Sequence, residues 1–271
     1  MLSGPTPVAQ GYWDAAADTY DQVFTNTLVG QTRREAVWRD LERVFQPRQR
    51  VLELNCGTGL DALHLAQRGV QVLACDISPR MVELARDRVA AAKLNVDFRV
   101  LANEDLAQLA TDGPFDGAFS NFSGLNCVDD LAAAARDLGS LLKPGSTALL
   151  CMVGRFVPWD FIWFLAHGNP GRAMQRIRGG ASRALDGGTL RVQYPTVREL
   201  RRLFAPWFRL RKWRGIGIGV PPSYMAHWTS RFPRTTRTLA AIDIPLGRTP
   251  MVRNMADCVL LHFERTDAAI R

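Results

Sequence analysis

The sequence lacks any run of about 18 uncharged apolar residues, the length that a helix needs to cross a bilayer. Its first residues, MLSGPTPVAQGYWD, have neither the basic start nor the apolar core of a secretory signal peptide. No internal repeat or low-complexity segment is visible. The 271 residues are enough for one large α/β domain, or for a domain of usual size with an insertion. We therefore expect a single folded unit in the cytoplasm.

The cysteines and histidines lack the spacing of a metal site or a disulfide framework. The five cysteines are odd in number, contain no CxxC pair, and mostly lie in or just after apolar runs. This pattern predicts buried free thiols in a reducing compartment. The four histidines are scattered, so the sequence predicts no metal site. The residues concerned are Cys56, Cys75, Cys127, Cys151 and Cys258, and His64, His167, His227 and His262.

Acidic residues are scarce in the second half of the chain. Residues 1–150 hold 14 Lys/Arg against 19 Asp/Glu, whereas residues 151–271 hold 20 against 7. Such a basic half can attract an anionic substrate, a membrane surface or RNA. A solvated, arginine-rich face would give the same count. The charge distribution alone leaves these alternatives open.

The middle of the chain alternates short apolar runs with helical periodicity, which is typical of parallel βαβ units. Gly69, Ser78-Pro79 and Lys143-Pro144-Gly145 supply the expected helix stop and start signals. The pattern predicts an α/β fold. Its predicted strands cover residues 50–55, 71–75, 97–101, 117–121 and 147–153, and its helices residues 59–68, 79–92 and 128–142.

The two ends depart from this alternation. Residues 12–45 read as one or two helices rich in aromatic residues, which we expect to cover the site. After the core come an insertion, a helix at 196–204, and strands at 208–215 and 257–264 separated by an aromatic and basic excursion at 221–243. The single domain therefore divides into an N-terminal helical lid (1–46), a core (47–153), a cap insertion (154–195) and the C-terminal part of the sheet (196–271).

A glycine-rich turn follows the first predicted strand. Residues 57–62 fit G-x-G-x-x-A, and Asp76 ends the next strand 19 residues after Gly57. This spacing suits a dinucleotide fingerprint, so a nicotinamide or flavin oxidoreductase is one hypothesis. However, Glu53 lies two residues before the turn segment, where its carboxylate would repel a pyrophosphate and favour a cationic amino-acid group. The turn also follows about 50 residues of helical lead-in, whereas dinucleotide domains usually begin with it.

Four segments in order, VLELNCGTG, VLACDISPRMVELAR, FDGAFSNFSGLNCV and LLKPGSTALL, resemble the class I S-adenosylmethionine-dependent methyltransferases. The resemblance covers roughly residues 50–153. It implies a Rossmann-like, mostly parallel seven-stranded sheet with an antiparallel last strand and helices on both faces. It also implies that S-adenosyl-L-methionine binds across the carboxyl ends of the first strands, with S-adenosyl-L-homocysteine as product.

The resemblance assigns the residues around the methionine part of the cofactor. Glu53, Gly57 and Gly59 would shape this part of the pocket. Asn55 stands where many family members have glycine, so the turn is expected to differ slightly in shape. Asn121, at the end of the fourth strand, lies where the family places the transferring methyl group.

The resemblance also assigns the nucleoside end. Asp76 would accept hydrogen bonds from both ribose hydroxyls, a bidentate role that suits a carboxylate. Ile77 and Met81 would sandwich the adenine. Asn103 and Glu104 follow the third strand, in the region that usually contacts the adenine amino group.

Catalysis of methyl transfer needs no obligatory general base when the acceptor is an amine or an ionised phenol, because holding its lone pair opposite the sulfur supplies most of the effect. The sequence accordingly assigns no catalytic residue. If a base is needed, Tyr20, His167 and His227 are the candidates.

The acceptor must be inferred from the cap. Its segment FVPWDFIWFLA (156–166) is too short to span a bilayer and is followed by arginines. It can form a wall of an apolar pocket, an interfacial membrane helix or a packed helix. The stretch SNFS (120–123) lacks the Asn/Asp-Pro-Pro-aromatic motif common in methyltransferases of nucleic-acid base amines.

We therefore predict methyl transfer to a small, apolar or aromatic molecule that can also carry an anionic group. Peripheral membrane contact stays open, and the sequence does not determine the oligomeric state. The alternative is a membrane-surface or RNA-binding protein, or an RNA methyltransferase, on the same fold. A third hypothesis is an NAD(P)-dependent oxidoreductase.

Overall fold

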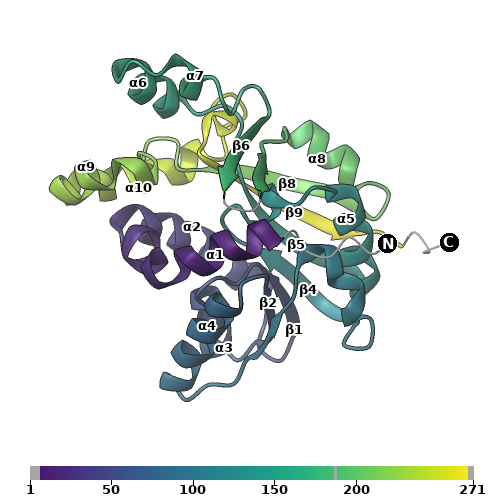
Figure 1. The fold of residues 1–271 in the computed structure, drawn as a ribbon. Helices are drawn as coiled ribbons and strands as arrows, with labels where there is room; N and C mark the ends of the chain where they lie inside the picture. The colour runs from purple at the N-terminus through teal and green to yellow at the C-terminus, as the bar shows by residue number, and fades with distance from the viewer. Residues whose placement is uncertain (1–6, 186–187, 268–271) are drawn as a thin grey trace.

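The computed structural model describes residues 7–185 and 188–267 and contains one seven-stranded sheet (Figure 1). Only β9 runs antiparallel to its two neighbours, so six strands point one way. The predicted Rossmann-like, mostly parallel sheet with an antiparallel last strand is therefore confirmed. Its strands, in spatial order, are β3 (Asp97–Val100), β2 (Gln71–Asp76), β1 (Arg50–Leu54), β4 (Phe115–Ser120), β5 (Leu142–Val153), β9 (Cys258–Arg265) and β8 (Phe208–Ile216).

Helices cover both faces because both faces of the central strands are apolar. Val51 packs on one side with the helices α2 (Leu28–Val44), α3 (Leu60–Gln67) and α4 (Pro79–Ala91). Leu52, one residue later, packs on the other side with α5 (Leu131–Leu141) and α8 (Val197–Phe204). Successive strand residues point to opposite faces, so these two adjacent apolar residues belong to two separate hydrophobic cores. Figure 1 shows these helix groups on opposite sides of the sheet.

The direction in which the chain adds strands reverses between β1 and β4. From β1 the chain moves outward through β2 and β3, and it then returns to place β4 on the other side of β1. In the pairing of β1 with β4, Leu54 lies opposite Ser120. Residues Asn55 and Asn121 are therefore the first beyond the paired ends. Such a switch point is where open α/β sheets bind ligands.

The start of β5 differs from the prediction. The stop signal Lys143-Pro144-Gly145 was expected to close a helix, with the strand beginning at Thr147, yet β5 begins at Leu142. Leu142 pairs with Phe115 and Thr147 with Gly117, so the four residues 143–146 stand against the single residue 116 of β4, and three of them are extra. Pro144 has no N–H to donate, which suits such an irregularity. The preceding helix starts at Leu131 rather than residue 128, because the Asp130 side chain accepts hydrogen bonds from two amides of its first turn.

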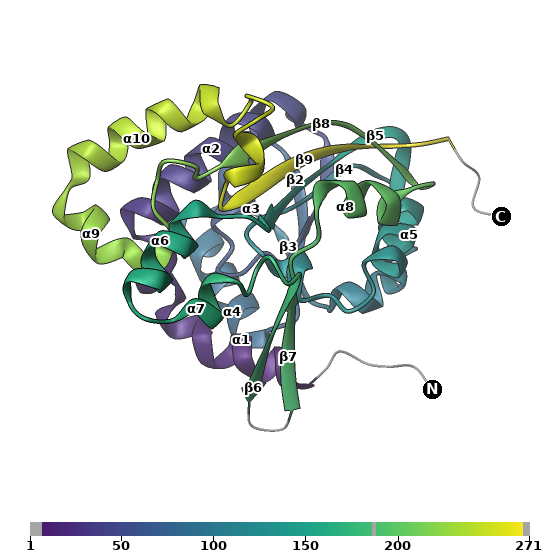
Figure 2. The same cartoon turned by 90° about the horizontal axis from the view of Figure 1, so that it is seen from above.

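The cap region contains more regular structure than its sequence predicts. Helices α6 (Pro158–Ala166) and α7 (Pro170–Ala173) lead into a hairpin of β6 (Gly180–Leu185) and β7 (Gly188–Gln193), which the sequence analysis did not foresee. Seen from above, the hairpin extends beside helix α1 (Pro7–Tyr20) (Figure 2). The buried Asn126 fixes its end by donating to the Gln193 carbonyl oxygen at 2.7 Å while accepting from the Val153 amide at 2.9 Å.

A buried group of charges joins the cap to the sheet and to α2. Arg176 contacts the carboxylates of Asp160 at 2.7 Å and Asp257 at 2.8 Å. Asp257 also pairs with Arg33 of α2, and the Tyr224 hydroxyl donates to Asp160 at 2.7 Å. The cations Arg33 and Arg176 lower the pKa of Asp257 against the effect of burial. The cap is thus held by ionic contacts rather than by the main apolar core.

We expect Arg176→Ala to lower the free energy of unfolding by about 2 kcal/mol, because it leaves Asp160 buried without its cation. The loss is limited because Arg33 still neutralises Asp257. Chemical denaturation followed by circular dichroism measures it. Arg178→Ala is the matched control, since Arg178 is exposed and has no carboxylate within 4.0 Å among the described residues. Equal effects of the two changes would contradict a role for the buried network.

Candidate active site

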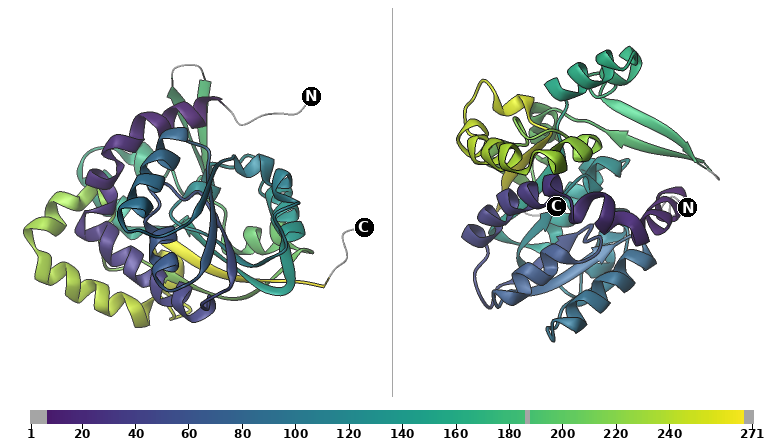
Figure 3. Two further views of the ribbon diagram at one scale, coloured as in Figure 1. Left: turned by 90° about the horizontal axis from the view of Figure 1, so that it is seen from below. Right: turned by 90° about the vertical axis from the view of Figure 1, so that its left-hand side faces the viewer.

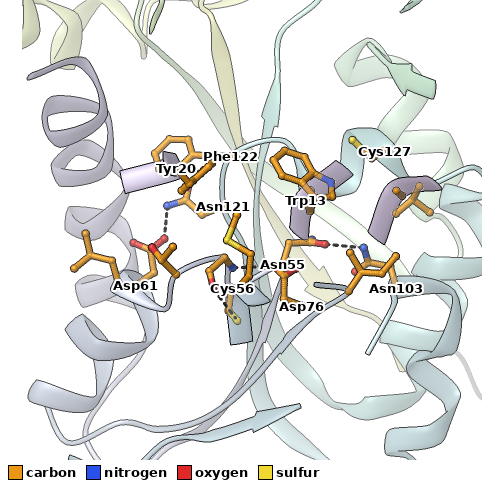
Figure 4. A pocket seen from close by; sticks show the side chains of 18 of the residues that line it. Trp13, Tyr20, Asn55, Cys56, Asp61, Asp76, Asn103, Asn121, Phe122 and Cys127 are labelled. Atoms are coloured by element: carbon orange, nitrogen blue, oxygen red, sulfur yellow. Dashed lines mark hydrogen bonds between the residues drawn. The ribbon is translucent and has the colours of Figure 1, made fainter. Parts of the chain in front are cut away.

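A pocket lies at the switch point, at the carboxyl ends of β1, β2 and β4 and under α1 (Figure 4). Among the residues that line it are nine of the sequence candidates: Tyr20, Asn55, Gly57, Asp76, Ile77, Met81, Asn103, Glu104 and Asn121. The lining also contains residues to which the sequence assigned no ligand contact, notably Trp13, Arg34, Thr58, Asp61, Phe122 and Cys127.

The two glycines of the turn are needed for different structural reasons. Both adopt left-handed backbone angles, with φ +52° at Gly57 and +74° at Gly59. A Cβ atom on Gly59 would lie 2.6 Å from the Cβ of Ala85, so this glycine allows α3 and α4 to approach closely. A Cβ on Gly57 would meet nothing within 4 Å. Gly57 therefore lines the pocket, whereas Gly59 is a packing residue beneath it.

We expect Gly59→Ala to lower the free energy of unfolding by about 2 kcal/mol through backbone strain and the contact with Ala85. Gly57→Ala should cost only about 1 kcal/mol, because it carries strain without a clash. Thermal denaturation of both variants provides the measurement. A larger loss for Gly57→Ala would contradict this division of roles.

Asp76 is the buried carboxylate of the pocket. Its two oxygens accept one backbone hydrogen bond each, from the Gly57 amide at 2.8 Å and from the Ser78 amide at 3.0 Å. Burial raises the pKa of Asp76, although these amide donors oppose the shift. Each carboxylate oxygen has a further lone pair, so the group can still accept hydrogen bonds from a ligand.

Asn55 organises the floor between the strand ends. It adopts a left-handed backbone with φ 57°. Its side chain donates to the Ser120 hydroxyl at 2.9 Å and accepts from the Asn103 amide at 2.8 Å. Gly124 packs against it so closely that a Cβ there would lie 2.1 Å from the Asn55 Cγ. The asparagine thus links three loops, and this link was not evident from the motif.

Asn121 is held by a second carboxylate, Asp61. The Asn121 amide donates to Asp61 Oδ2 at 2.9 Å, and this same oxygen pairs with Arg34. Trp38 donates to the other oxygen, Oδ1, at 2.6 Å. Because a carboxylate only accepts, the amide orientation of Asn121 is fixed. Its Oδ1 atom is buried and has no hydrogen-bond partner among the described residues.

The chain is strained directly after Asn121. Phe122 and Ser123 have φ angles of 49° and 73°, which are costly for residues with a Cβ. Strain of this kind commonly lies at functional sites. The Phe122 ring lies over the Arg34 guanidinium and edge-on to Phe24, so aromatic packing supports the loop.

Glu53 does not line the pocket. It is fully buried inside β1, and burial, together with the negative charge of Asp61, raises its pKa well above the usual range. Its Oε2 atom has no hydrogen-bond partner within the described part of the chain. Glu53 therefore lies outside the pocket lining, and burial favours its neutral form.

Among the candidate bases, only Tyr20 lines the pocket. Burial raises its pKa to about 12, although the charge of Arg34 opposes the shift. At neutral pH it is therefore a phenol that donates a hydrogen bond, not a base. His167, at the end of α6, and His227, in α9 (Ala226–Arg231), are exposed and lie outside the pocket lining.

Helix α1 is fastened to the elements that form the pocket. Asp14 accepts from the Ser78 hydroxyl at 2.5 Å, which places this contact on the first turn of α4. Just after α1, Asp21 accepts from the Thr58 hydroxyl at 2.8 Å and pairs with Arg88. The helix thus covers the pocket through polar contacts to the glycine turn and to α4.

Other site types have no support in residues 7–185 and 188–267. No group of three or more His, Cys, Asp or Glu side chains there could hold a metal ion. The five cysteines are free thiols, and four of them are buried as predicted, whereas Cys127 is half-buried. No helix in the same ranges has the length and apolar character needed to cross a bilayer.

Comparison with known proteins shows which family the chain resembles. Residues 51–145 match the methyltransferase domain family. The matched residues run from β1 to the start of β5, so this part of the chain is similar to known methyltransferase domains. The resemblance of the four segments to methyltransferases is therefore confirmed over residues 51–145.

Curated relatives match less than half of this chain. Ubiquinone biosynthesis O-methyltransferase of Xanthomonas campestris is 41% identical over 113 residues, which are 42% of this chain and 46% of the relative. The protein of the same name from Xanthomonas oryzae is 40% identical over 106 residues, 39% and 44% of the two chains. The chain thus spans less than half the length of the curated relatives it matches.

Solved structures resemble the whole fold. The DhpI complex with S-adenosylhomocysteine has a TM-score of 0.60 at 18% identity, covering 98% of this chain and 100% of the other. The [4+2]-cyclase SpnF has a TM-score of 0.62 at 17% identity, covering 98% of each chain. At such low identity these similarities describe the fold alone.

Proposed function

We propose that the protein transfers the methyl group of S-adenosyl-L-methionine to a small, apolar or aromatic acceptor. The observation that carries the proposal is the pocket at the switch point between β1 and β4. Eight of the ten residues that the resemblance assigns to the cofactor line it together. The five free cysteines suit a reaction in the reducing cytoplasm.

The residues of the pocket fit this cofactor. Asp76 has acceptor capacity left for a ribose diol, and Ile77 and Met81 offer apolar surfaces for a purine. The unpartnered oxygen of Asn121 suits a ligand that brings a hydrogen-bond donor or positive charge, because an unsatisfied buried acceptor costs about 1–3 kcal/mol. When bound, the cofactor supplies an electrophilic methyl group on a positively charged sulfur. The protein then contributes mainly position and exclusion of water.

The acceptor side of the pocket is aromatic. Trp13, Tyr20 and Phe122 contribute rings to the lining. Arg34 is neutralised by Asp61, which favours a neutral acceptor at this point over an anion. The neutral Tyr20 hydroxyl can hold an oxygen or nitrogen acceptor as a hydrogen-bond donor. These features support a phenol or another flat, weakly polar molecule.

The names of the curated relatives favour oxygen as the accepting atom. Their similarity to this chain is confined to a segment of 113 residues or fewer. That segment corresponds in length to the cofactor-binding core, whereas the acceptor is selected by the cap and the N-terminal helices. We therefore propose O-methylation without naming the molecule.

Calorimetric titration with S-adenosylhomocysteine, NAD and NADP tests the cofactor. We expect saturable binding of the homocysteine compound alone, and binding of a dinucleotide would overturn the proposal. Transfer of labelled methyl groups to matched phenols, anilines and benzoates then tests the acceptor. Cofactor binding without transfer to any of these, or to RNA, would instead indicate a methyltransferase fold used without methyl transfer.

A further inference from the structure

Helix α6 presents an apolar stripe to solvent. Ile162 is 64% exposed and Leu165, one turn later, is 54% exposed. The opposite side of the helix already has its partners, because Phe164 packs on Tyr224 and Asp160 joins the buried charge network. The stripe is therefore not an unfinished contact with the core. Phe156 and Met174, in the neighbouring turns of the cap, add exposed apolar surface.

Arginines without acidic partners lie in the cap and in the segment around residues 231–234. One of them, Arg172, lies over the Phe164 ring. Arg172 and Arg178 follow α6 in the cap, and Arg231 and Arg234 lie where α9 meets α10 (Pro233–Leu246). All four are exposed, and none has a carboxylate within 4.0 Å among the residues that the structure describes. Phe232 is exposed between the last two. Figure 3, right, looks onto this side of the molecule, where α6 and the α9–α10 corner both face the viewer.

Acidic residues are nearly absent from these segments. Between Pro221 and Ile242 the sequence contains none. In the described cap residues, Asp160 is the only carboxylate, and it is buried against Arg176. The exposed surface of this side therefore combines aliphatic groups with uncompensated positive charge.

We propose that this side of the protein binds the surface of an anionic lipid bilayer. The nine residues of α6 measure about 14 Å along the helix axis, too short to span a membrane but suited to lie in its interface. Ile162 and Leu165 would enter the headgroup region while the four arginines meet lipid phosphates. This inference does not depend on methyl transfer.

Two other occupants fit the surface less well. A second copy of this chain in a two-fold contact would bring the two sets of arginines together, and like charges oppose such pairing. A single-stranded nucleic acid is bound mainly through aromatic platforms and basic grooves. Here the two most exposed groups of α6 are aliphatic. Charge complementarity together with an aliphatic stripe favours the bilayer.

Sedimentation with vesicles tests the proposal on the full chain. We expect binding to phosphatidylcholine vesicles that contain phosphatidylglycerol, and at least about tenfold weaker binding to pure phosphatidylcholine or at high salt. A single-stranded RNA competitor and analytical ultracentrifugation are run in parallel. Failure to bind the anionic vesicles, or equal binding to both kinds, would overturn the proposal whatever the methyl-transfer result.

Variants separate the apolar from the ionic contribution. Ile162→Ser with Leu165→Ser, and separately Arg172→Gln with Arg231→Gln, should each weaken vesicle binding about tenfold or more. The matched controls are Met251→Ser, at a side chain 86% exposed, and Arg201→Gln with Arg202→Gln on α8. Controls and variants should bind S-adenosylhomocysteine equally, which checks the fold. Vesicle binding that is unchanged in the first two double variants would contradict the proposal. So would a result in which these variants lose dimer formation or RNA binding instead of vesicle binding.

Discussion

Asp61→Asn should lower the free energy of unfolding by about 3–5 kcal/mol, the largest stability loss expected for a single substitution in this protein. Asp61 Oδ2 accepts from both Arg34 and Asn121. An amide nitrogen there would face two donors, and the oxygen in its place would still leave the buried Arg34 without a counter-charge. Urea denaturation followed by tryptophan fluorescence measures the loss.

A double-mutant cycle gives the control for Asp61. Arg34→Met combined with Asp61→Asn should cost less than the sum of the two single changes, because neither charge is then left unpaired. Glu83→Gln removes an exposed carboxylate that pairs with Arg80 and should change stability by less than about 1 kcal/mol. A similarly small effect of Asp61→Asn would show that the buried pair does not stabilise the fold.

Asp76→Asn should weaken binding of S-adenosylhomocysteine by about 100-fold. The carboxylate can accept two charge-assisted hydrogen bonds from a diol, whereas an amide offers one neutral acceptor in the same place. Titration calorimetry gives the dissociation constant. Asp97→Asn, an exposed carboxylate at the start of the adjacent strand β3, is the control. An unchanged dissociation constant would remove Asp76 from the site.

The pH dependence of ligand affinity provides an independent test of the role of Asp76. We expect the ligand to bind the ionised carboxylate of Asp76, so its affinity should be lost as pH falls through the pKa of this group. Since burial raises the pKa of Asp76, this loss should begin at higher pH than for an exposed aspartate. Asp76→Asn should lack this pH dependence.

The core of the fold could be predicted because its signals are local. The apolar runs of β1, β2 and β4, the glycine turn and Ser78-Pro79 at the start of α4 each specify a short piece of structure. The right-handed connections between parallel strands then leave few possible strand orders. The antiparallel position of β9 came from the family resemblance and is confirmed by its pairing with β5 and β8.

The polar interior of the pocket could not be predicted, since it depends on long-range contacts. Arg34 and Asp61 are separated by 27 residues, and nothing in either segment identifies the other as its partner. Asp61 is an unspecified position of the glycine motif, although an aspartate in the first turn of α3 was a usable signal. The hairpin β6–β7 was missed because its glycine-rich sequence resembles a loop, and Asn126 holds it from another part of the chain.

The contacts of α1 bear on how long a ligand stays in the site. Asp14 accepts a hydrogen bond from Ser78, and Asp21, just after α1, contacts Thr58 and Arg88. The three partners lie on or beside the elements that form the pocket. We expect a ligand that leaves past α1 to require these contacts to break. The residence time of a bound ligand should then shorten when either carboxylate is neutralised.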